Sequence, residues 1–264
     1  MHPPQRIDLT GRAALVTGGT KGLGAAIARA FLASGAEVMV GARGAPAEPV
    51  SADGRTAVFR AADVRDPEAA AGLVAAAAAR FGRLDVLVNN AGGSPDAEAA
   101  TVSPRFVEKV VALNLLAPFS VAQAANLVMR EQPGGGSVIN IGSVSAHVPQ
   151  PGTAAYSAAK AGLLGLTRAL ALEWAPRVRV NHITAGLVRT ERAAALYGED
   201  GGAAVASTVP MGRLAEPQDV AHACLWLACD LSSYVNGADL AVHGGGEFPA
   251  RHLARRTAFP FSSG

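Results

Sequence analysis

The stretch Thr17-Gly18-Gly19-Thr20-Lys21-Gly22-Leu23-Gly24 decides the fold. It lies between an apolar run of strand length, Ala13–Thr17, and an apolar run of helical length, Gly22–Ser34. Glycines let the chain turn tightly and let a ligand approach the backbone closely. The helix that follows begins with unpaired N–H groups and a partial positive charge, which together favour a phosphate group. The turn therefore predicts the pyrophosphate site of a bound dinucleotide.

Apolar runs of strand length alternate with longer helical runs along the rest of the chain. The expected strands cover residues 13–17, 37–40, 56–60, 84–88, 137–141, 178–183 and 239–242. The expected helices cover 22–34, 67–81 with Asp66 as N-cap, 103–129, 155–174 and 217–228. The strands lack strict polar alternation, which is typical of strands covered on both faces. This order predicts an α/β fold: a Rossmann-like, doubly wound parallel sheet of seven strands flanked by helices.

No linker divides the chain, so we expect residues 1–248 to form a single dinucleotide-binding and catalytic domain. Residues 190–210 are rich in alanine, glycine and serine between two regular elements. A loop of this length in a compact domain predicts a lid. Residues 249–264 are expected to form a C-terminal tail.

Composition excludes several classes of protein. The chain has 264 residues, 50% hydrophobic and 17% charged, with a formal net charge of +2. A charge this close to neutral gives no electrostatic case for nucleic acid. We find no apolar run suited to a membrane span and no hydrophobic core of a signal peptide, so a cytoplasmic location is expected. Cys224 and Cys229 form no metal-ligand pattern, so no metal is expected.

The end of the second strand indicates which dinucleotide binds. An NAD site usually carries an acidic residue there, which accepts the ribose hydroxyls. Here Arg43 stands at that end, and Lys21 lies in the glycine turn. A guanidinium and an ammonium suit a 2′-phosphate, so NADP(H) is favoured over NAD(H). The alternative is that Arg43 is an ordinary solvated surface residue.

Tyr156 and Lys160 are the candidate acid–base pair. They are four residues apart in the helix expected at 155–174, so their side chains share one face. A free tyrosine has a pKa of about 10, which is too high for proton transfer at neutral pH, and a nearby ammonium lowers it. Most pairs with this spacing are surface coincidences. The chain has only three lysines, however, and two of them fall at Lys21 and Lys160.

Two further polar residues belong to the candidate site. Ser143 follows the fifth strand at the carboxyl edge, where sheets of this kind bind ligands, and its hydroxyl suits a carbonyl oxygen that gains negative charge. Ser145 is the second choice for this role. Asn114 falls inside a long apolar helix, where a buried amide needs a partner. Asn114 therefore indicates a kink in the helix or a bound water, and the alternative is that it caps a turn.

Together these motifs resemble the short-chain dehydrogenase/reductase family, in its compact branch with TGxxxGxG and YxxxK motifs. The resemblance covers about residues 8–246. It implies that Asn114, Ser143, Tyr156 and Lys160 are catalytic, with Asn114 holding a proton-relay water beside the lysine. It also implies that Lys160 lowers the tyrosine pKa and holds the ribose. The implied cofactor contacts are Gly18, Thr20, Lys21, Gly22, Leu23, Gly24, Arg43, Asp63, Val64, Asn90, Ala91, Gly92, Tyr156, Lys160, Gly186, Val188 and Thr190.

Two positions depart from the family pattern. Ala185 stands where a proline is usual, which removes rigidity beside the nicotinamide, and His243 stands where an aspartate is usual. The substrate rim is expected to include Ser145, His147, Gln150 and Leu187. His147 and Gln150 are alternatively solvated loop residues.

The resemblance implies an NADP(H)-dependent oxidoreductase that moves a hydride between nicotinamide and a ketone or secondary alcohol. Because the pocket wall is mainly apolar, we expect a 3-oxoacyl or cyclic ketone as substrate. The alternatives are an NAD-dependent alcohol dehydrogenase and a non-catalytic NADP(H) sensor. Homodimers or homotetramers that pair through helices 103–129 and 155–174 are expected by resemblance.

Overall fold

The protein was analysed as a computed structural model, which describes residues 7–191, 197–198, 200 and 202–253. Seven strands form one sheet in the order β5-β2-β1-β6-β7-β8-β9, and every neighbouring pair is parallel. The strands are β1 (Ala13–Thr17), β2 (Glu37–Ala42), β5 (Val58–Ala61), β6 (Val86–Asn89), β7 (Gly136–Ile141), β8 (Val178–Ala185) and β9 (Asp239–Val242). The predicted seven-stranded parallel sheet is confirmed, with strand ends within two residues of those expected.

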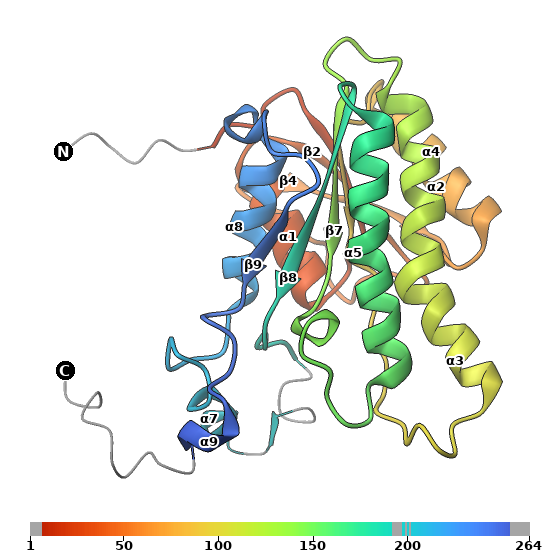
Figure 1. Ribbon diagram of the computed structural model, residues 1–264. Helices are drawn as coiled ribbons and strands as arrows, with labels where there is room; N and C mark the ends of the chain where they lie inside the picture. Colours follow the sequence, from red (N-terminus) through yellow and green to blue (C-terminus); the bar gives the residue numbers. More distant parts are fainter. Residues whose placement is uncertain (1–6, 192–196, 199, 201, 254–264) are drawn as a thin grey trace, which may run out of the picture.

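Helices cover both faces of the sheet (Figure 1). One face carries α1 (Gly22–Ala33) and α8 (Pro217–Ala228), and the other carries α2 (Pro67–Phe81), α4 (Ala117–Met129) and α5 (Ala154–Trp174). The predicted N-cap of α2 is confirmed, because the Asp66 side chain accepts a hydrogen bond from the N–H of Glu68. Short elements complete the described chain: η2 (Val144–Ala146), α7 (Ala203–Ala206), η3 (Asp230–Ser232) and α9 (Ala250–Leu253).

Each face of the sheet has its own hydrophobic core, because successive strand residues point to opposite sides. On β1, Val16 packs toward α1 and α8, whereas its neighbour Leu15 packs toward α2 and α4. All five residues of β1 are buried. Burial on both faces explains why the sequence shows apolar runs without alternation.

The third predicted strand, 56–60, is wrong in one respect. The chain forms a small antiparallel hairpin, β3 (Ser51–Ala52) and β4 (Arg55–Thr56), before β5 begins. Asp53 and Gly54 turn this hairpin with φ of 47° and 75°. An Asp-Gly pair at positive φ is a favoured two-residue hairpin turn, so the signal was present in the sequence.

The helix expected at 103–129 is one continuous element with an irregular turn. It begins as α3 (Pro104–Val111), passes through a π-helical turn, η1 (Ala112–Leu116), and continues as α4. By length and composition alone, Pro104–Met129 would suffice to cross a membrane, contrary to our expectation from the sequence. Its α4 part packs against α2 and the sheet, and core helices of soluble proteins share these properties.

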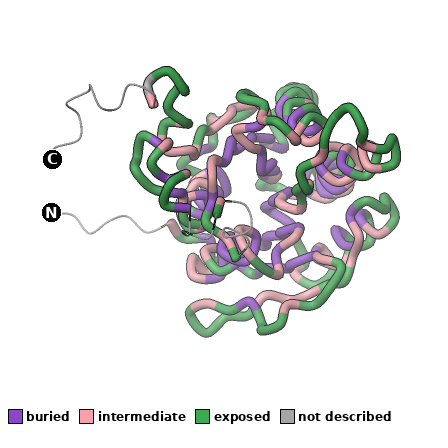
Figure 2. Tube along the Cα trace, turned by 90° about the horizontal axis from the view of Figure 1, so that it is seen from below, coloured by how far each residue is buried: buried purple, intermediate pink, exposed green. Residues whose placement is uncertain are grey.

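The carboxyl ends of the parallel strands meet at one edge of the sheet. In Figure 1 this is the lower edge, and Figure 2 views the molecule from that side. The strand order places β2 on one side of β1 and β6 on the other: the chain runs outward from β1 through β2 to β5, and then crosses back to β6 on the far side of β1. In such sheets the crevice at this reversal is where ligands bind.

Candidate active site

The glycine turn has the geometry of a close-approach loop. Gly18 has φ of +65° and Gly22 has φ of +52°, both in the left-handed region. A Cβ at Gly24 would lie 2.3 Å from the carbonyl oxygen of Gly18. Asn90 fastens the loop, because its side-chain amide donates to the carbonyl oxygens of Thr17 and Gly18 at 2.9 and 3.2 Å. The turn therefore requires glycine for backbone reasons, as predicted.

A carboxylate already lies at the start of α1. The backbone N–H of Gly22 donates to Oε1 of Glu191 at 3.1 Å, and the Thr190 side chain lies beside the same glycine. The carboxylate is a stand-in for an anion at a helix N-terminus, so the donor set fits a phosphate group. The structure thus brings Thr190, predicted as a cofactor contact, to the glycine turn.

The far end of this crevice carries positive charge. Arg43 is exposed just past β2, and Lys21 is exposed at the N-cap of α1. Asp63, predicted to face the adenine, forms an ion pair with Arg65 at 2.5 Å. Hydrogen bonds from Arg65 lower the pKa of the Asp63 carboxyl, and the charge of Arg43 adds to this effect. Val64, its predicted neighbour, is buried in the core and presents only backbone.

Lys160 lies at the centre of the candidate catalytic cluster. Its side chain is buried within α5, and Nζ donates a 2.7 Å hydrogen bond to the carbonyl oxygen of Ile141, the last residue of β7. Nζ lies 5.7 Å from the centroid of the Tyr156 ring, as predicted from their spacing. Burial lowers the pKa of the Lys160 ammonium to about 8.

Tyr156 and Ser143 meet through their hydroxyl groups. A hydrogen bond from Ser143 lowers the pKa of Tyr156, but burial outweighs it and the pKa is raised. The net pKa of Tyr156 is therefore raised, where the sequence led us to expect it to be lowered. The reason is that desolvation of the phenolate dominates, while the ammonium is several ångströms from the ring.

Asn114 lies in the π-helical turn, which confirms the predicted irregularity of the helix. Its amide nitrogen donates to the carbonyl oxygens of Gly93 and Val110, and its Oδ1 accepts from the N–H of Gly93 at 2.9 Å. A Cβ at Gly92 would lie 2.9 Å from Asn114 Oδ1 and 3.3 Å from Lys160 Nζ. Because Gly92 has no Cβ, Asn114 Oδ1 and Lys160 Nζ can both lie close to its backbone.

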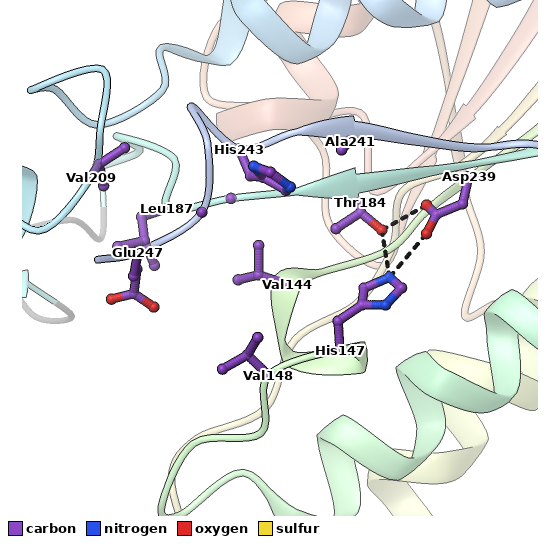
Figure 3. Close-up of a pocket in the computed structure, with 12 residues that line it drawn as sticks. Val144, His147, Val148, Thr184, Leu187, Val209, Asp239, Ala241, His243 and Glu247 are labelled. Atoms are coloured by element: carbon purple, nitrogen blue, oxygen red, sulfur yellow. Dashed lines mark hydrogen bonds and ion pairs between the residues drawn. The ribbon is translucent and has the colours of Figure 1, made fainter. Parts of the chain in front are cut away.

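A cavity of about 240 Å³ opens beside Ser143, lined by residues from η2, β8, β9 and the segments after them (Figure 3). Its apolar residues are Val144, Val148, Leu187 and Val209, and its polar residues are His147, Thr184, Asp239, His243 and Glu247. Thus His147 and Leu187, both predicted, line it. Ser145 is instead buried, and its N–H donates to Ser143 Oγ. Gln150 lies outside the lining and contacts Glu247 at 3.4 Å.

Tyr197 is a site residue that sequence reasoning missed. Burial raises the pKa of Tyr197, although a hydrogen bond from the backbone of Val188 acts to lower it. The charge of an ionised Tyr197 in turn raises the pKa of Tyr156. Tyr197 belongs to the predicted lid, of which residues 192–196, 199 and 201 lie outside the described residues. Nothing in its local sequence distinguishes it from a loop tyrosine. In the described part of the chain, no group of three or more histidine, cysteine or acidic residues suits a metal.

Known proteins share this architecture. A family model described as enoyl-(acyl carrier protein) reductase matches residues 18–247. A D-threitol dehydrogenase of Mycolicibacterium smegmatis is 39% identical over 90% of this chain and 93% of its own length. A 3alpha-hydroxysteroid dehydrogenase of Mediterraneibacter gnavus is 35% identical over 89% and 97%. A crystal structure of a putative short-chain alcohol dehydrogenase from Sinorhizobium meliloti superposes with a TM-score of 0.83, at 37% identity over 91% and 98%.

Proposed function

Because this chain belongs to the short-chain dehydrogenase/reductase family, oxidoreductases that act on alcohols or carbonyl compounds, we propose that it reduces a ketone with NADPH. The observation that carries the proposal is the meeting of Tyr156, Ser143 and Lys160 at the carboxyl edge of the sheet. The experiment is a panel of ketones monitored by loss of NADPH absorbance. A panel in which no ketone is reduced with either nicotinamide cofactor would contradict the proposal.

Each residue of the cluster has a distinct part in the reaction. When bound, the nicotinamide supplies the hydride that adds to the carbonyl carbon. Tyr156 gives the proton to the carbonyl oxygen, and Ser143 donates a hydrogen bond that stabilises negative charge on that oxygen. Because Ser143 lies close enough to Tyr156 to lower its pKa, we propose that both hydroxyls reach the same carbonyl oxygen.

Lys160 supports this chemistry in two ways. Its ammonium stabilises the phenolate that forms as Tyr156 loses its proton. Its hydrogen bond to Ile141 holds α5 against the strand end that leads into Ser143. A pKa of about 8 keeps the amine mostly protonated at neutral pH, and we propose that it also binds the ribose hydroxyls.

Arg43 and Lys21 support NADPH over NADH as the cofactor. We expect Arg43→Ala to reduce kcat/KM for NADPH by about 10- to 100-fold, because a charge-assisted bidentate contact is worth about 1.5–3 kcal/mol. The value for NADH should change by less than about threefold. Arg29→Ala, at an exposed position in the middle of α1, is the matched control. An Arg43→Ala enzyme that keeps its preference for NADPH would refute this assignment.

Glu191 competes with the cofactor in this proposal, because its carboxylate uses the N–H of Gly22. We expect Glu191→Gln to lower the Kd for NADPH by about threefold to tenfold, since a charged hydrogen bond is replaced by a weaker one. The Kd is measured by quenching of protein fluorescence, without turnover. Glu131→Gln, at an exposed position far from the site, is the control. An unchanged or higher Kd for Glu191→Gln would show that the carboxylate does not compete.

The apolar part of the cavity supports a ketone on a hydrophobic or cyclic skeleton, including a 3-oxoacyl group. The named relatives act on a small polyol and on a steroid, so the family scaffold accepts both polar and apolar skeletons. The second candidate is NAD-dependent oxidation of an alcohol, which the cofactor comparison separates from NADPH-dependent reduction. A non-catalytic NADP(H) sensor would bind NADPH yet reduce no ketone.

We further propose that the protein is a cytoplasmic homodimer or homotetramer. Large apolar side chains are exposed on η1, α4 and α5, where Leu116, Leu127 and Leu172 are 54%, 55% and 83% exposed. Light scattering coupled to size exclusion measures the assembly directly. Elution as a monomer at micromolar concentration would contradict this proposal.

A further inference from the structure

Asp239, which lines the cavity, contacts two histidines, of which Figure 3 shows His147. Its Oδ2 lies 2.9 Å from Nε2 of His147, on the segment after Ser143, and its Oδ1 lies 2.8 Å from Nδ1 of His182, on β8. Thr184 donates to the same Oδ1 at 2.7 Å. Because its oxygens are occupied by groups on β8 and on the segment after η2, Asp239 is itself unavailable to a ligand.

The charge of Asp239 fixes which ring nitrogen of His147 carries the proton. Burial raises the pKa of Asp239, but hydrogen bonds from Thr184 and His182 outweigh burial and leave the pKa lowered, so the carboxylate is ionised at neutral pH. An ionised carboxylate only accepts hydrogen bonds, and Thr184 gives its hydroxyl proton to Asp239, so Nε2 of His147, 3.1 Å from Thr184 Oγ1, carries a proton. In a ring with one proton, Nδ1 is then the hydrogen-bond acceptor, and it has no partner among the described residues.

The rest of the cavity wall adds further hydrogen-bonding capacity. Glu247 lines the wall, and among the described residues its side-chain contacts are long, at 3.4 Å to Gln150 and 3.5 Å to Thr208. His243, at the position where the family usually has aspartate, also lines the wall, but its Nδ1 is buried away from the open space. A purely hydrocarbon ligand would leave the Glu247 carboxylate facing apolar surface, which costs free energy.

We propose that His147, oriented by Asp239, is a specificity-determining residue that accepts a hydrogen bond from a substrate hydroxyl group other than the reacting oxygen. The inference rests on the proposed function and narrows its substrate class to hydroxylated ketones, or to diols in the reverse direction. Asp239 is a positioning residue in this proposal, because it acts through His147. Val144, Val148 and Leu187 provide the apolar wall against which the carbon skeleton packs.

The test compares cyclohexanone with its 2-, 3- and 4-hydroxy derivatives and with the matching methoxy derivatives. We expect kcat/KM of the wild-type protein to be about tenfold higher for at least one hydroxy isomer than for cyclohexanone, which corresponds to about one net hydrogen bond. The methoxy counterpart should lose this advantage, because an ether oxygen cannot donate to an acceptor.

Two variants assign the preference to His147. His147→Phe keeps a planar ring without nitrogen, so the ratio of kcat/KM for the preferred hydroxy isomer to kcat/KM for cyclohexanone should fall to about twofold or less. His222→Phe, the same substitution at an exposed position on α8, should leave the advantage intact. Asp239→Asn should raise KM for the preferred hydroxy isomer more than KM for cyclohexanone, a difference between substrates that general loss of structure would not produce.

The outcomes separate this inference from the proposed function. Reduction of cyclohexanone without preference for any hydroxy isomer, or a preference that survives His147→Phe, overturns the inference and leaves the proposed function standing. If no ketone is reduced, the proposed function fails. The pocket is then tested by the Tm shift that 1,2-, 1,3- and 1,4-cyclohexanediol cause relative to cyclohexanol. A larger shift for a diol that His147→Phe abolishes supports the inference, and equal shifts overturn it.

Discussion

Tyr156→Phe is expected to lower kcat for ketone reduction by about 1000-fold, within the range by which a positioned acid or base accelerates a reaction. The substitution removes the one hydroxyl that can give a proton to the carbonyl oxygen while keeping the ring that packs beside Lys160. The Kd for NADPH should stay within about threefold, because phenylalanine preserves the shape of the site. Steady-state kinetics and fluorescence titration on the same preparation provide the two values.

Tyr234→Phe is the matched control, because Tyr234 is fully exposed and far from the cluster in sequence. Its kcat should equal that of the wild type. A Tyr156→Phe protein with kcat above about one tenth of the wild-type value would contradict the assigned acid. Loss of kcat together with loss of NADPH binding would show that the hydroxyl also serves cofactor binding, and would contradict a role confined to proton transfer.

Lys160→Met is expected to abolish most activity and yet stabilise the fold. Burial lowers the pKa of Lys160 from 10.5 to about 8, so the charged form costs the folded state about 3 kcal/mol at neutral pH. Methionine removes that cost but loses the hydrogen bond to Ile141, worth about 1 kcal/mol. The free energy of unfolding at pH 7 should therefore rise by about 2 kcal/mol, while kcat/KM falls by about 100-fold or more.

The stability cost of the buried Lys160 ammonium depends on pH, and its direction follows from the lowered pKa. Between pH 8 and 10.5 the unfolded chain binds more protons at this position than the folded chain, so stability due to Lys160 rises with pH across that window. The advantage of Lys160→Met should accordingly be full below pH 8 and give way, near pH 10.5, to a deficit approaching about 1 kcal/mol from the lost hydrogen bond. Chemical denaturation at both pH values measures it, with Lys109→Met, an exposed lysine of α3, as control. A variant less stable than wild type at pH 7 would contradict the prediction.

The fold could be predicted from sequence because its signals are local. Burial on both faces gives apolar runs, and the glycine turn needs glycine for steric reasons visible in the order of residues. The hairpin at Asp53-Gly54 was missed although its signal is local too. Its strands are only two residues long and mostly polar, Ser51-Ala52 and Arg55-Thr56, so no apolar run marks them.

The catalytic cluster was predicted from spacing and resemblance, but its electrostatics were not. Spacing places Lys160 beside Tyr156, yet the raised pKa of Tyr156 depends on how many atoms surround the phenol, which no local pattern shows. The link between His147 and Asp239 was missed for a similar reason. It joins segments far apart in the chain, and only the pairing of β8 with β9 brings Asp239 near.

The hydrogen bond from Lys160 to Ile141 has a consequence for how this protein tolerates change. It ties the helix that carries the phenol to the strand that leads into the serine, so the two hydroxyls keep their spacing whatever happens on the outside of α5. The distant end of that helix, where Leu172 is 83% exposed, is free to vary with solvent or with a neighbouring subunit. Residues on the exposed side of α5 can therefore change while Tyr156 and Ser143 keep their relative positions.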